Sequence, residues 1–561
     1  MINTVTGMAE AGSRVATMAI AELDPPPAFD IEAENLQQAT CSKDSKDALP
    51  DVAQDQGIQE IAGMTASPTL IKSDEDLRNV NGALSDPTLW PKWKKRRVLF
   101  IVCAYYFLFT FITTVTVPTF NDLQTYFVIS YEQVTYTVAV PALALAVSPF
   151  FWTPMAEALG RRTVMVLGCL VATLASLGVA LETTYKGYMV FRFLQGWGVG
   201  PASTVGLQML GELHRSQEMI PAKPLGEDIY LEHERGQKVG YWCLSIDIGL
   251  LFGPLIGGFA ALASWNFPNW LTVIIFGVLL LIMLIFLPET AGYPIQPPQY
   301  SAQPPPVSSL PTAPTKALPW LNFRTLLTRP KPWDSTFHFF RLFAFPNIAI
   351  TIIFYCWTWY WFILCVITML PGAYPDYNPQ VQGLLFLGFI VGTLISEMLF
   401  SGGLSDYLVR RAMQKANGER VPEKRLLLYF PAAILTTIGL VLFGCTVQLN
   451  WHWFIAQIAT FLIGTGIQIG NTTSISYVVD VYPQHVMDVT LFYTFHLNLS
   501  AFASPFFIVP WIERIGWAWC FGVQGAIVTA SCLIFAPFLY MYGRWLRDWK
   551  GPIPWGNTQT S

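Results

Sequence analysis

The chain has 561 residues, of which 53% are hydrophobic, 14% aromatic and only 12% charged, and its formal net charge is -4. So much apolar surface cannot be buried inside one soluble core, which predicts a membrane protein. The sequence offers no concentrated basic face, and this excludes nucleic acid as an expected partner.

Most of the nine cysteines lie inside apolar runs, without CxxC spacing and without clustered histidines beside them. Metal sites and redox pairs need such spacing, so we expect these cysteines to pack as small core residues. The sequence also lacks a clustered nucleophile and base and a phosphate-binding glycine-rich loop. We therefore expect neither an enzyme nor a bound cofactor or metal.

Residues 1–91 differ in composition from the rest of the chain, being poor in aromatic residues and rich in Asp, Glu, Ser, Gln and Ala. Such segments cannot bury enough apolar area to offset the entropy of ordering. We expect an acidic, disordered cytoplasmic tail. A basic cluster at 92–97 then precedes the first long apolar run.

The apolar runs that follow are long enough to cross about 30 Å of hydrocarbon at about 1.5 Å per residue. The expected spans, about twelve in number, are 98–118, 134–152, 163–181, 188–210, 240–262, 270–287, 346–370, 381–401, 426–447, 452–476, 486–511 and 517–542.

A proline-rich segment at 291–340 favours an extended cytoplasmic linker. It separates 92–290 from 341–547, with six expected spans in each part, and a short cytoplasmic tail follows at 548–561. The predicted fold class is an all-α membrane protein of 12 transmembrane helices in two six-helix, pseudo-symmetric halves.

Basic residues mark one side of the expected membrane. Arg161, Arg162, Arg410, Arg411 and the 92–97 cluster fall on one side, whereas the opposite loops hold only Lys186 and Arg514. Cytoplasmic flanks retain positive charge during insertion, so both termini and the central linker are expected in the cytoplasm.

The loops after the second and eighth spans carry the same pattern. Glu157 is followed by Gly160, Arg161 and Arg162, and Asp406 is followed by Arg410 and Arg411. An acid before paired arginines in each half indicates an internally duplicated transporter, whose helix-end charges can latch one conformer. A topology signal alone remains the alternative.

This loop resembles the G-x-L-x-D-R-x-G-R-R motif of the major facilitator superfamily, and two further spans resemble motifs of that family. Arg192 and Gln195 lie in R-x-x-Q-G-x-G in span four, where the arginine is expected to face the bundle interior and engage substrate or a proton site. Snorkelling of Arg192 to the outer interface is the alternative.

Span five carries the pattern G-x-x-x-G-P-x-x-G-G, which is similar to the motif of the family's antiporters. Glycines four residues apart form a flat helix face that admits another helix closely, and a proline bends the span. An ordinary packing face is the alternative reading. The motif residues are Gly249, Gly253, Pro254, Gly257 and Gly258.

The resemblance extends over roughly 84–547 and points to the fungal 12-spanner drug:proton antiporter group. It implies a secondary transporter that exports a small organic compound such as a drug, toxin or metabolite, driven by protons. The expected setting is the plasma membrane, or alternatively the vacuolar membrane, with a protein that functions as a monomer in the lipid bilayer. Uptake of an organic nutrient or cation on the same fold is the alternative function.

The resemblance places spans one, four, seven and ten around the cavity. Trp357, Tyr360 and Trp361 are expected on one face of span seven, and Gln468 and Asn471 on one stripe of span ten. An aromatic wall opposite amides suits a flat amphiphilic molecule. Packing of these rings against lipid and neighbouring helices is the alternative.

Ionisable residues deep in a span are costly and therefore point to function. Asp247 in span five, His496 in span eleven and Glu397 in span eight are the candidates for carrying the coupling proton, since carboxylates and imidazoles exchange protons. A structural hydrogen-bonding role is the alternative for each.

Overall fold

The computed structural model describes residues 90–214, 228–290, 334–415, 421–482 and 485–554. The regular secondary structure in these ranges is helical, and they contain no strand. The expected tail at 1–91 lies outside the described residues except for its last two positions, as does the expected linker up to 333. The all-helical class predicted from the sequence is confirmed.

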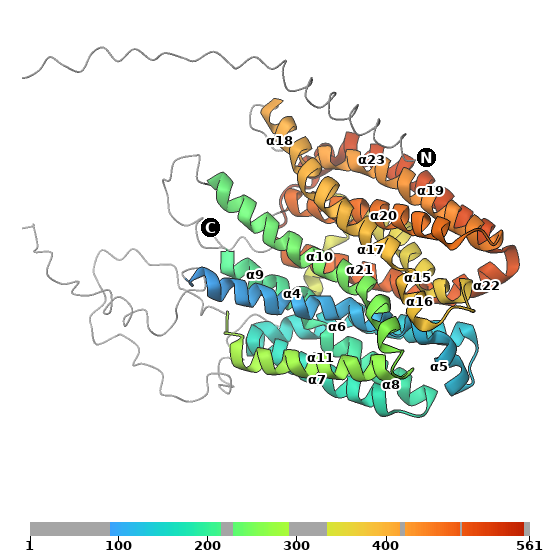
Figure 1. Ribbon diagram of the computed structural model, residues 1–561. Coiled ribbons are helices and arrows are strands. Elements are labelled where there is room, and N and C mark those ends of the chain that lie inside the picture. Colours follow the sequence, from blue (N-terminus) through green and yellow to red (C-terminus); the bar gives the residue numbers. More distant parts are fainter. Residues whose placement is uncertain (1–89, 215–227, 291–333, 416–420, 483–484, 555–561) are drawn as a thin grey trace, which may run out of the picture. The chain divides into compact units, whose positions relative to one another are not determined.

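The first half is drawn in blue to green in Figure 1. Its helices are α4 (Lys92–Thr114), η2 (Val117–Thr119), α5 (Phe120–Phe127), α6 (Tyr131–Leu159), α7 (Arg161–Leu181), α8 (Tyr185–Val199), α9 (Pro201–His214), α10 (Asp228–Ala260) and α11 (Phe267–Phe286).

The second half runs from yellow to red. Its helices are α13 (Asp334–Leu342), α14 (Pro346–Tyr355), η5 (Cys356–Tyr360), α15 (Trp361–Ala373), α16 (Pro379–Leu384), α17 (Leu387–Ser396), η6 (Glu397–Leu404), α18 (Ser405–Lys415), η7 (Pro422–Leu428), α19 (Tyr429–Gln448), α20 (Trp453–Val481), α21 (Val486–Ala503), α22 (Pro505–Ile515) and α23 (Trp517–Lys550).

Nine helices among the described residues are long and apolar enough to cross a membrane, and the bent pair α21–α22 makes a tenth. The expected fourth span is divided between α8 and α9, which meet at Gly200. The apolar part of α10 is only Leu244–Ala260, because the helix begins with the polar sequence from Asp228. These helices occupy the places of the fourth and fifth expected spans.

Helix α13 begins at Asp334, inside the segment expected to be linker up to 340. This stretch has no proline and carries Phe337, Phe339 and Phe340, so it can form about two and a half turns of amphipathic helix that packs on α6 and α21. Helix α13 thus occupies the last residues of the segment expected to be linker.

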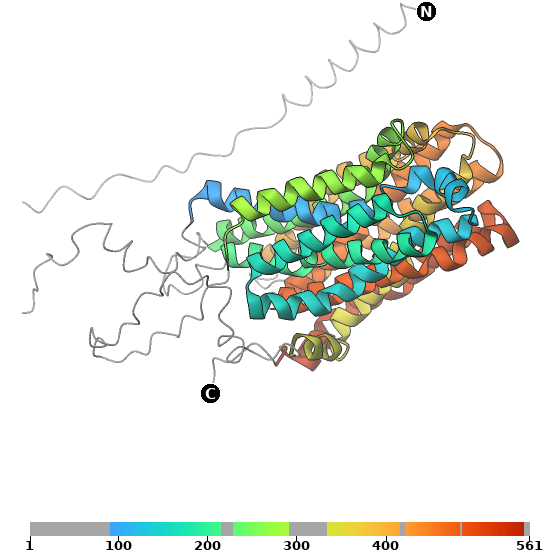
Figure 2. The same ribbon diagram turned by 90° about the horizontal axis from the view of Figure 1, so that it is seen from below.

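Each half packs mainly within itself, and the two halves meet along a seam. In the first half α10 packs on α4, and α7 packs on α8 and α11; in the second, α19 packs on α20 and α23. Across the seam, α6 contacts α21, and α10 contacts α16 and α17. Figure 2 shows the same bundle from below, with the helices of both halves running along one common direction.

The glycine stripe of α10 packs against α4 of the same half. A Cβ at Gly249, Gly253 or Gly257 would collide with α4, whose Thr110 and Thr114 hydroxyls also donate to carbonyls of α10 at 2.5 and 2.8 Å. Gly258 differs, because a Cβ there would lie 2.5 Å from the carbonyl oxygen of Pro379, at the start of α16. One end of the motif thus brings the two halves into backbone contact.

At the loop after α6, Gly160 adopts a φ of 93°, which favours glycine. Glu289, which follows α11, accepts from the backbone N–H groups of Arg161 and Arg162 at 3.0 and 3.2 Å. This carboxylate caps the N-terminus of α7, a favourable place for negative charge. The side chains of Glu157, Asp406 and Arg410 lie outside the described residues, so the expected latch between them stays a prediction.

Candidate functional site

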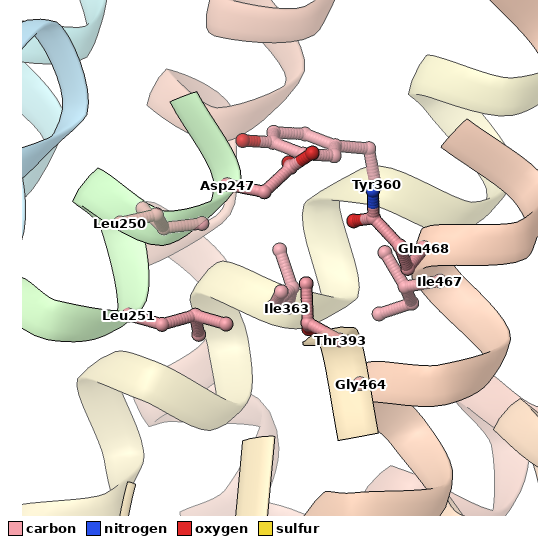
Figure 3. A pocket seen from close by; sticks show the side chains of 9 residues that line it. All are labelled: Asp247, Leu250, Leu251, Tyr360, Ile363, Thr393, Gly464, Ile467 and Gln468. Carbon is pink, nitrogen blue, oxygen red and sulfur yellow. The ribbon is translucent and has the colours of Figure 1, made fainter. Parts of the chain in front are cut away.

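The carboxylate of Asp247 lies on α10 at the seam and is only 9% exposed. It accepts two hydrogen bonds of 3.1 Å from the amide nitrogen of Asn471, which lies on α20 in the other half. A buried carboxylate is costly unless polar partners compensate it. This contact therefore joins the two halves through the acid, which Figure 3 shows beside the ring of Tyr360.

A second carboxylate comes from the other half. Glu397 begins η6, is half-buried, and accepts from Gln468 Nε2 at 2.9 Å and from the hydroxyl of Thr472 at 3.1 Å. Each half thus contributes one acid, and donors on α20 satisfy both.

The polar face of α20 follows from sequence spacing. Gln468, Asn471 and Thr472 stand at i, i+3 and i+4, so a helix presents them together. Tyr493 on α21 extends this network by donating its hydroxyl to Asn471 Oδ1. Asn471 is therefore held by Tyr493 on one side while it donates to Asp247 on the other.

A cavity of about 10 Å³ adjoins this network, close to the size of one water. Asp247 and Gln468 are its charged and amide groups, and the rest of the lining is mostly apolar. The lining residues are Asp247, Leu250, Leu251, Tyr360, Ile363, Thr393, Gly464, Ile467 and Gln468. The centre of the bundle is closed around the acid in this conformer.

Two π-helical turns border the site. One is η5, which carries Tyr360, and the other is η6, which begins at Glu397. A π turn widens the helix locally and shifts the register of the side chains that follow, and such turns are frequent at functional sites.

The π turn separates the three rings that the sequence places on one face of span seven. Tyr360 lines the cavity with Asp247. Trp361 packs on Phe507 and Trp511 of α22, with ring centroids 5.0 and 6.4 Å apart. Trp357 is 39% exposed and donates through Nε1 to His496 Nδ1 at 3.2 Å. The three rings thus have different neighbours, and any contact of theirs with cargo stays a prediction.

His496 lies apart from the acids, among phenylalanine rings. Its ring centroid is 4.5 Å from that of Phe492 and 5.3 Å from that of Phe495. Nδ1 accepts from Trp357, while Nε2 is buried without a hydrogen-bond partner among the described residues. A neutral imidazole with its proton on Nε2 fits these contacts. Its role as a proton carrier stays a prediction.

Arg192 and Gln195 lie inside the first half. The fully buried guanidinium of Arg192 donates to the carbonyl oxygens of Ile112 at 2.7 Å and Thr137 at 3.0 Å, and to Gln195 Oε1 at 3.0 Å. The amide of Gln195 donates in turn to Ser176 at 2.8 Å. Neither residue lines the cavity beside Asp247, so their expected contact with substrate remains untested.

Two polar residues of the network are absent from the sequence-based candidates. Tyr493 stands one turn before His496 in an apolar span, and Thr472 follows Asn471 directly. A polar residue beside a predicted polar stripe is the available signal for Thr472. No such signal marks Tyr493, because its partner lies on another helix.

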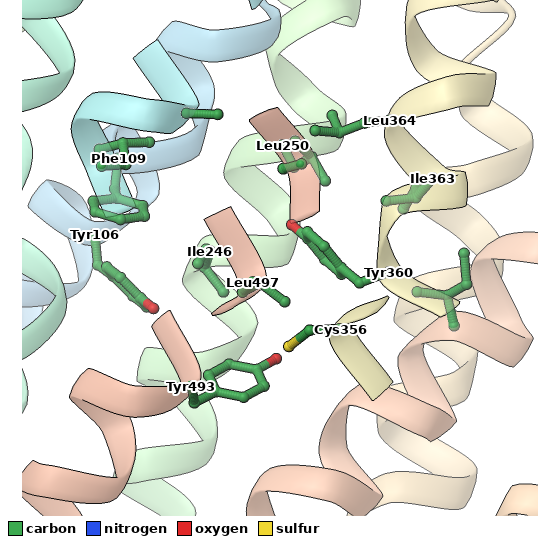
Figure 4. Close-up of a cluster of buried hydrophobic side chains, with 14 of the residues drawn as sticks. Tyr106, Phe109, Ile246, Leu250, Cys356, Tyr360, Ile363, Leu364, Tyr493 and Leu497 are labelled. Carbon is green, nitrogen blue, oxygen red and sulfur yellow. The ribbon is translucent and has the colours of Figure 1, made fainter. Parts of the chain in front are cut away.

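Buried, mostly apolar side chains lie beside Tyr360 and Tyr493 at the seam (Figure 4). Tyr106 and Phe109 come from α4, Ile246 and Leu250 from α10, and Tyr360 from η5. Such a layer excludes water and strengthens the electrostatic interactions inside it. Within the described ranges, no group of three or more His, Cys, Asp or Glu side chains could hold a metal ion.

Comparisons with known proteins agree with this arrangement. The model of the Major Facilitator Superfamily matches residues 99–505. An ascochitine biosynthesis cluster MFS transporter of Didymella fabae is 26% identical over 476 residues, which cover 82% of this chain and 86% of the relative. The MFS-type transporter atr4 of Stereocaulon alpinum is 23% identical over 536 residues, covering 94% and 89%.

Among solved structures, a partially occluded inward-open conformation of the xylose transporter XylE from E. coli is similar, with a TM-score of 0.54 and 13% identity. The match covers 80% of this chain and 99% of that chain. At this identity the likeness concerns the fold.

Proposed function

Because this chain belongs to the major facilitator superfamily of membrane transporters, we propose that it exports small organic compounds in exchange for protons that move inward. The observation that carries the proposal is the bond between Asp247 and Asn471, which places a buried acid between the two halves. Proton binding at that acid can therefore change the contact between the halves.

The coupling step follows from the chemistry of this contact. An ionised Asp247 accepts from Asn471 with both oxygens, whereas a protonated one keeps one carbonyl acceptor and gains a donor. Protonation also removes the cost of a buried charge. The proton would thus exchange a charged pairing across the seam for a neutral one, which favours the conformer in which the centre is closed and Asp247 is buried.

Glu397 makes the effect of a proton larger. Its negative charge lies on the other half, and Gln468 and Thr472 hold it beside the same polar face of α20. Two carboxylates repel each other in a low-dielectric interior, so protonation of either one lowers the free energy of the closed centre.

The cargo class follows from the cavity lining. Leu250, Leu251, Ile363 and Ile467 present apolar surface, and Tyr360 adds a ring with a hydroxyl. Such a lining suits an amphiphilic organic molecule once the cavity widens. The name of the Didymella fabae relative, a biosynthesis cluster transporter, supports a metabolite as cargo.

We place the protein in the plasma membrane, as a monomer with both termini cytoplasmic. This orientation rests on the basic residues at one end of the bundle, which include Arg161, Arg162 and Arg411.

Purified protein in liposomes tests the proposal, with a cargo first chosen from a panel of fluorescent amphiphilic compounds by what the native protein expels from cells. Exchange predicts that an acidic lumen drives cargo accumulation inside, because protons leave as cargo enters. Symport predicts accumulation with an acidic exterior instead, which is the outcome expected for the uptake alternative.

The variant Asp247→Asn should lose accumulation driven by the pH difference while retaining downhill cargo flux. Asp376→Asn, which changes an exposed carboxylate in the loop before α16, is the matched control and should behave as native. A native response of Asp247→Asn to the pH difference would assign Asp247 a structural role.

A further inference from the structure

A second cavity opens at one end of the bundle, where α13 and the end of α23 meet. It has a volume of about 330 Å³ and shares no lining residue with the central cavity beside Asp247. Arg341 and Phe345 line it from the α13 side, and Lys550, Pro552 and Pro554 line it from the α23 side. Its volume is ample for a polar headgroup, unlike that of the closed central cavity.

Two cations face this cavity. Arg341 stands in the last turn of α13, and Lys550 ends α23. The ammonium of Lys550 lies 5.7 Å from the ring centroid of Phe345 and 5.8 Å from that of Trp549, within the range of cation–π attraction. These rings hold the long side chain at the cavity without neutralising its charge.

The wall beyond α23 is fixed by the sequence that follows it. Gly551 turns the chain with a φ of 72°, and its N–H donates to the carbonyl oxygen of Arg547 at 2.9 Å. Ile553 is only 1% exposed and anchors the segment to the bundle, while Pro552 and Pro554 restrict its backbone. The cavity is therefore a built feature of the fold.

The nearby carboxylate of Asp548 is engaged elsewhere. It lies 3.9 Å from Arg544 and 4.0 Å from Arg547, and neither arginine lines the cavity. Glu423 pairs with Arg547 at 3.2 Å. Among the residues that line the cavity, the charged ones are Arg341 and Lys550.

Large aromatic side chains are exposed on the two helices that end at the cavity. Phe337 and Phe340 on α13 are each 61% exposed, and Trp545 and Trp549 on α23 are 59% and 64% exposed. The two tryptophans stack with ring centroids 5.8 Å apart. Tryptophan is enriched where a bilayer meets water, so this end of the bundle lies at the level of lipid headgroups.

We propose that the Arg341 and Lys550 cavity binds the headgroup of a net-anionic phospholipid, with its phosphate between the two cations and its acyl chains beside the exposed rings. Basic pockets at the cytoplasmic face fit anionic headgroups, and both helices end on the side predicted to be cytoplasmic. The site is separate from the transport route and does not depend on proton coupling.

The test titrates the purified full-length protein in neutral detergent with short-chain phosphatidylserine, with the zwitterionic short-chain phosphatidylcholine, and with inorganic phosphate. We expect saturable binding of phosphatidylserine and at least tenfold weaker binding of the other two. Arg341→Gln and Lys550→Gln should each weaken phosphatidylserine binding about fivefold, and the double variant about 25-fold. Lys550→Arg should keep the native affinity.

Arg544→Gln is the matched control, because it removes an exposed cation from the same end of α23 without touching the cavity lining. Its affinity should stay within about twofold of native. If this control lost as much affinity for phosphatidylserine as the double variant, binding would depend on general surface charge, and the proposed site would be wrong. Binding of inorganic phosphate as tight as that of phosphatidylserine would overturn the lipid assignment. The monodisperse elution of each variant reports that it is folded.

Discussion

Arg192 illustrates how a buried cation is accommodated by backbone groups that lack other partners. Thr137 is four residues before Pro141 in α6, and Pro141 has no N–H to donate to the carbonyl oxygen of Thr137. Ile112 lies in the last turn of α4, where carbonyls have no intrahelical donor. The guanidinium donates to both carbonyl oxygens. One side chain thus satisfies the carbonyl that Pro141 leaves without a donor and a carbonyl at the end of α4.

Removing this side chain should destabilise the first half. Arg192→Leu leaves the carbonyls of Ile112 and Thr137 buried without donors, which costs about 2–4 kcal/mol and lowers the thermal unfolding temperature. Arg514→Leu, at an exposed position, is the control and should change that temperature little. If Arg192→Leu kept the native unfolding temperature but lost transport, the guanidinium would act on cargo or protons instead.

Glu397 and Asp247 should differ in what they contribute. Glu397→Gln keeps one oxygen that can accept from Gln468 or Thr472, so the local structure should persist. We expect this variant to accumulate cargo under a pH difference at a reduced rate, whereas Asp247→Asn should fail. Flux measured in the same liposomes compares them. If Glu397→Gln lost the accumulation driven by the pH difference while Asp247→Asn retained it, Glu397 and not Asp247 would be the residue that couples protons to transport.

At the level of elements, the close approach of α10 to α4 depends on glycine. Gly253→Leu would drive a side chain into Thr114 and the backbone of α4, and should reduce both thermal stability and transport, with a cost of about 2–4 kcal/mol. Gly277→Leu on α11 is the control, because no atom lies within 4 Å of a Cβ there. If Gly253→Leu and Gly277→Leu had the same thermal stability, the close contact between α10 and α4 at Gly253 would be contradicted.

The sequence predicts the helical elements better than the register inside them. Glycines four residues apart predict a close helix contact, and the polar spacing of Gln468 and Asn471 predicts one face of α20. The π turn at 356–360 is not predictable in the same way, because the extra residue is accommodated by packing against other helices. That turn is the reason why Trp357 and Trp361 do not share the environment of Tyr360.

At the scale of the whole molecule, contacts across the seam lie at both ends and at the centre. Near the predicted cytoplasmic end, Phe150 of α6 packs on Phe339 of α13 at 4.8 Å and on Phe495 of α21 at 5.5 Å, measured between ring centroids. At the opposite end, Gly258 meets Pro379. A transporter that alternates between inward-open and outward-open conformers must break the contacts at one end of the seam while it keeps those at the other end.

Duplicated motifs and the change in composition at the linker predict two halves, and the family match agrees with that prediction. The partners of Asp247 across the seam are not predictable from either half alone. Asn471 is 224 residues away, and the pairing depends on how two packed units meet. The depth of Asp247 in its predicted span indicates that burial of its charge is costly. Only the assembled fold identifies the groups that compensate this cost.

Tyr131 provides a contact of this kind at the end opposite the predicted cytoplasmic side. Its hydroxyl accepts from the N–H of Gly372 at 3.0 Å and donates to the carbonyl oxygen of Thr368 at 2.8 Å. These two backbone groups would otherwise pair with each other in the last turn of α15. A side chain from the first half is thus inserted into a helix of the second, which fastens the seam there.

Tyr131→Phe should therefore loosen this end, since it keeps the ring but removes both hydrogen bonds between the halves. Loss of about 1–2 kcal/mol shifts the balance between closed and open conformers about five- to thirtyfold. Spin labels at Thr125 and Asp376, on exposed positions of the two halves, should report a larger long-distance population. Tyr136→Phe is the matched control, because its hydroxyl donates at 2.6 Å to Glu132 of its own helix. An unchanged distance distribution in Tyr131→Phe, or the same change in Tyr136→Phe, would show that this hydroxyl does not hold the halves together.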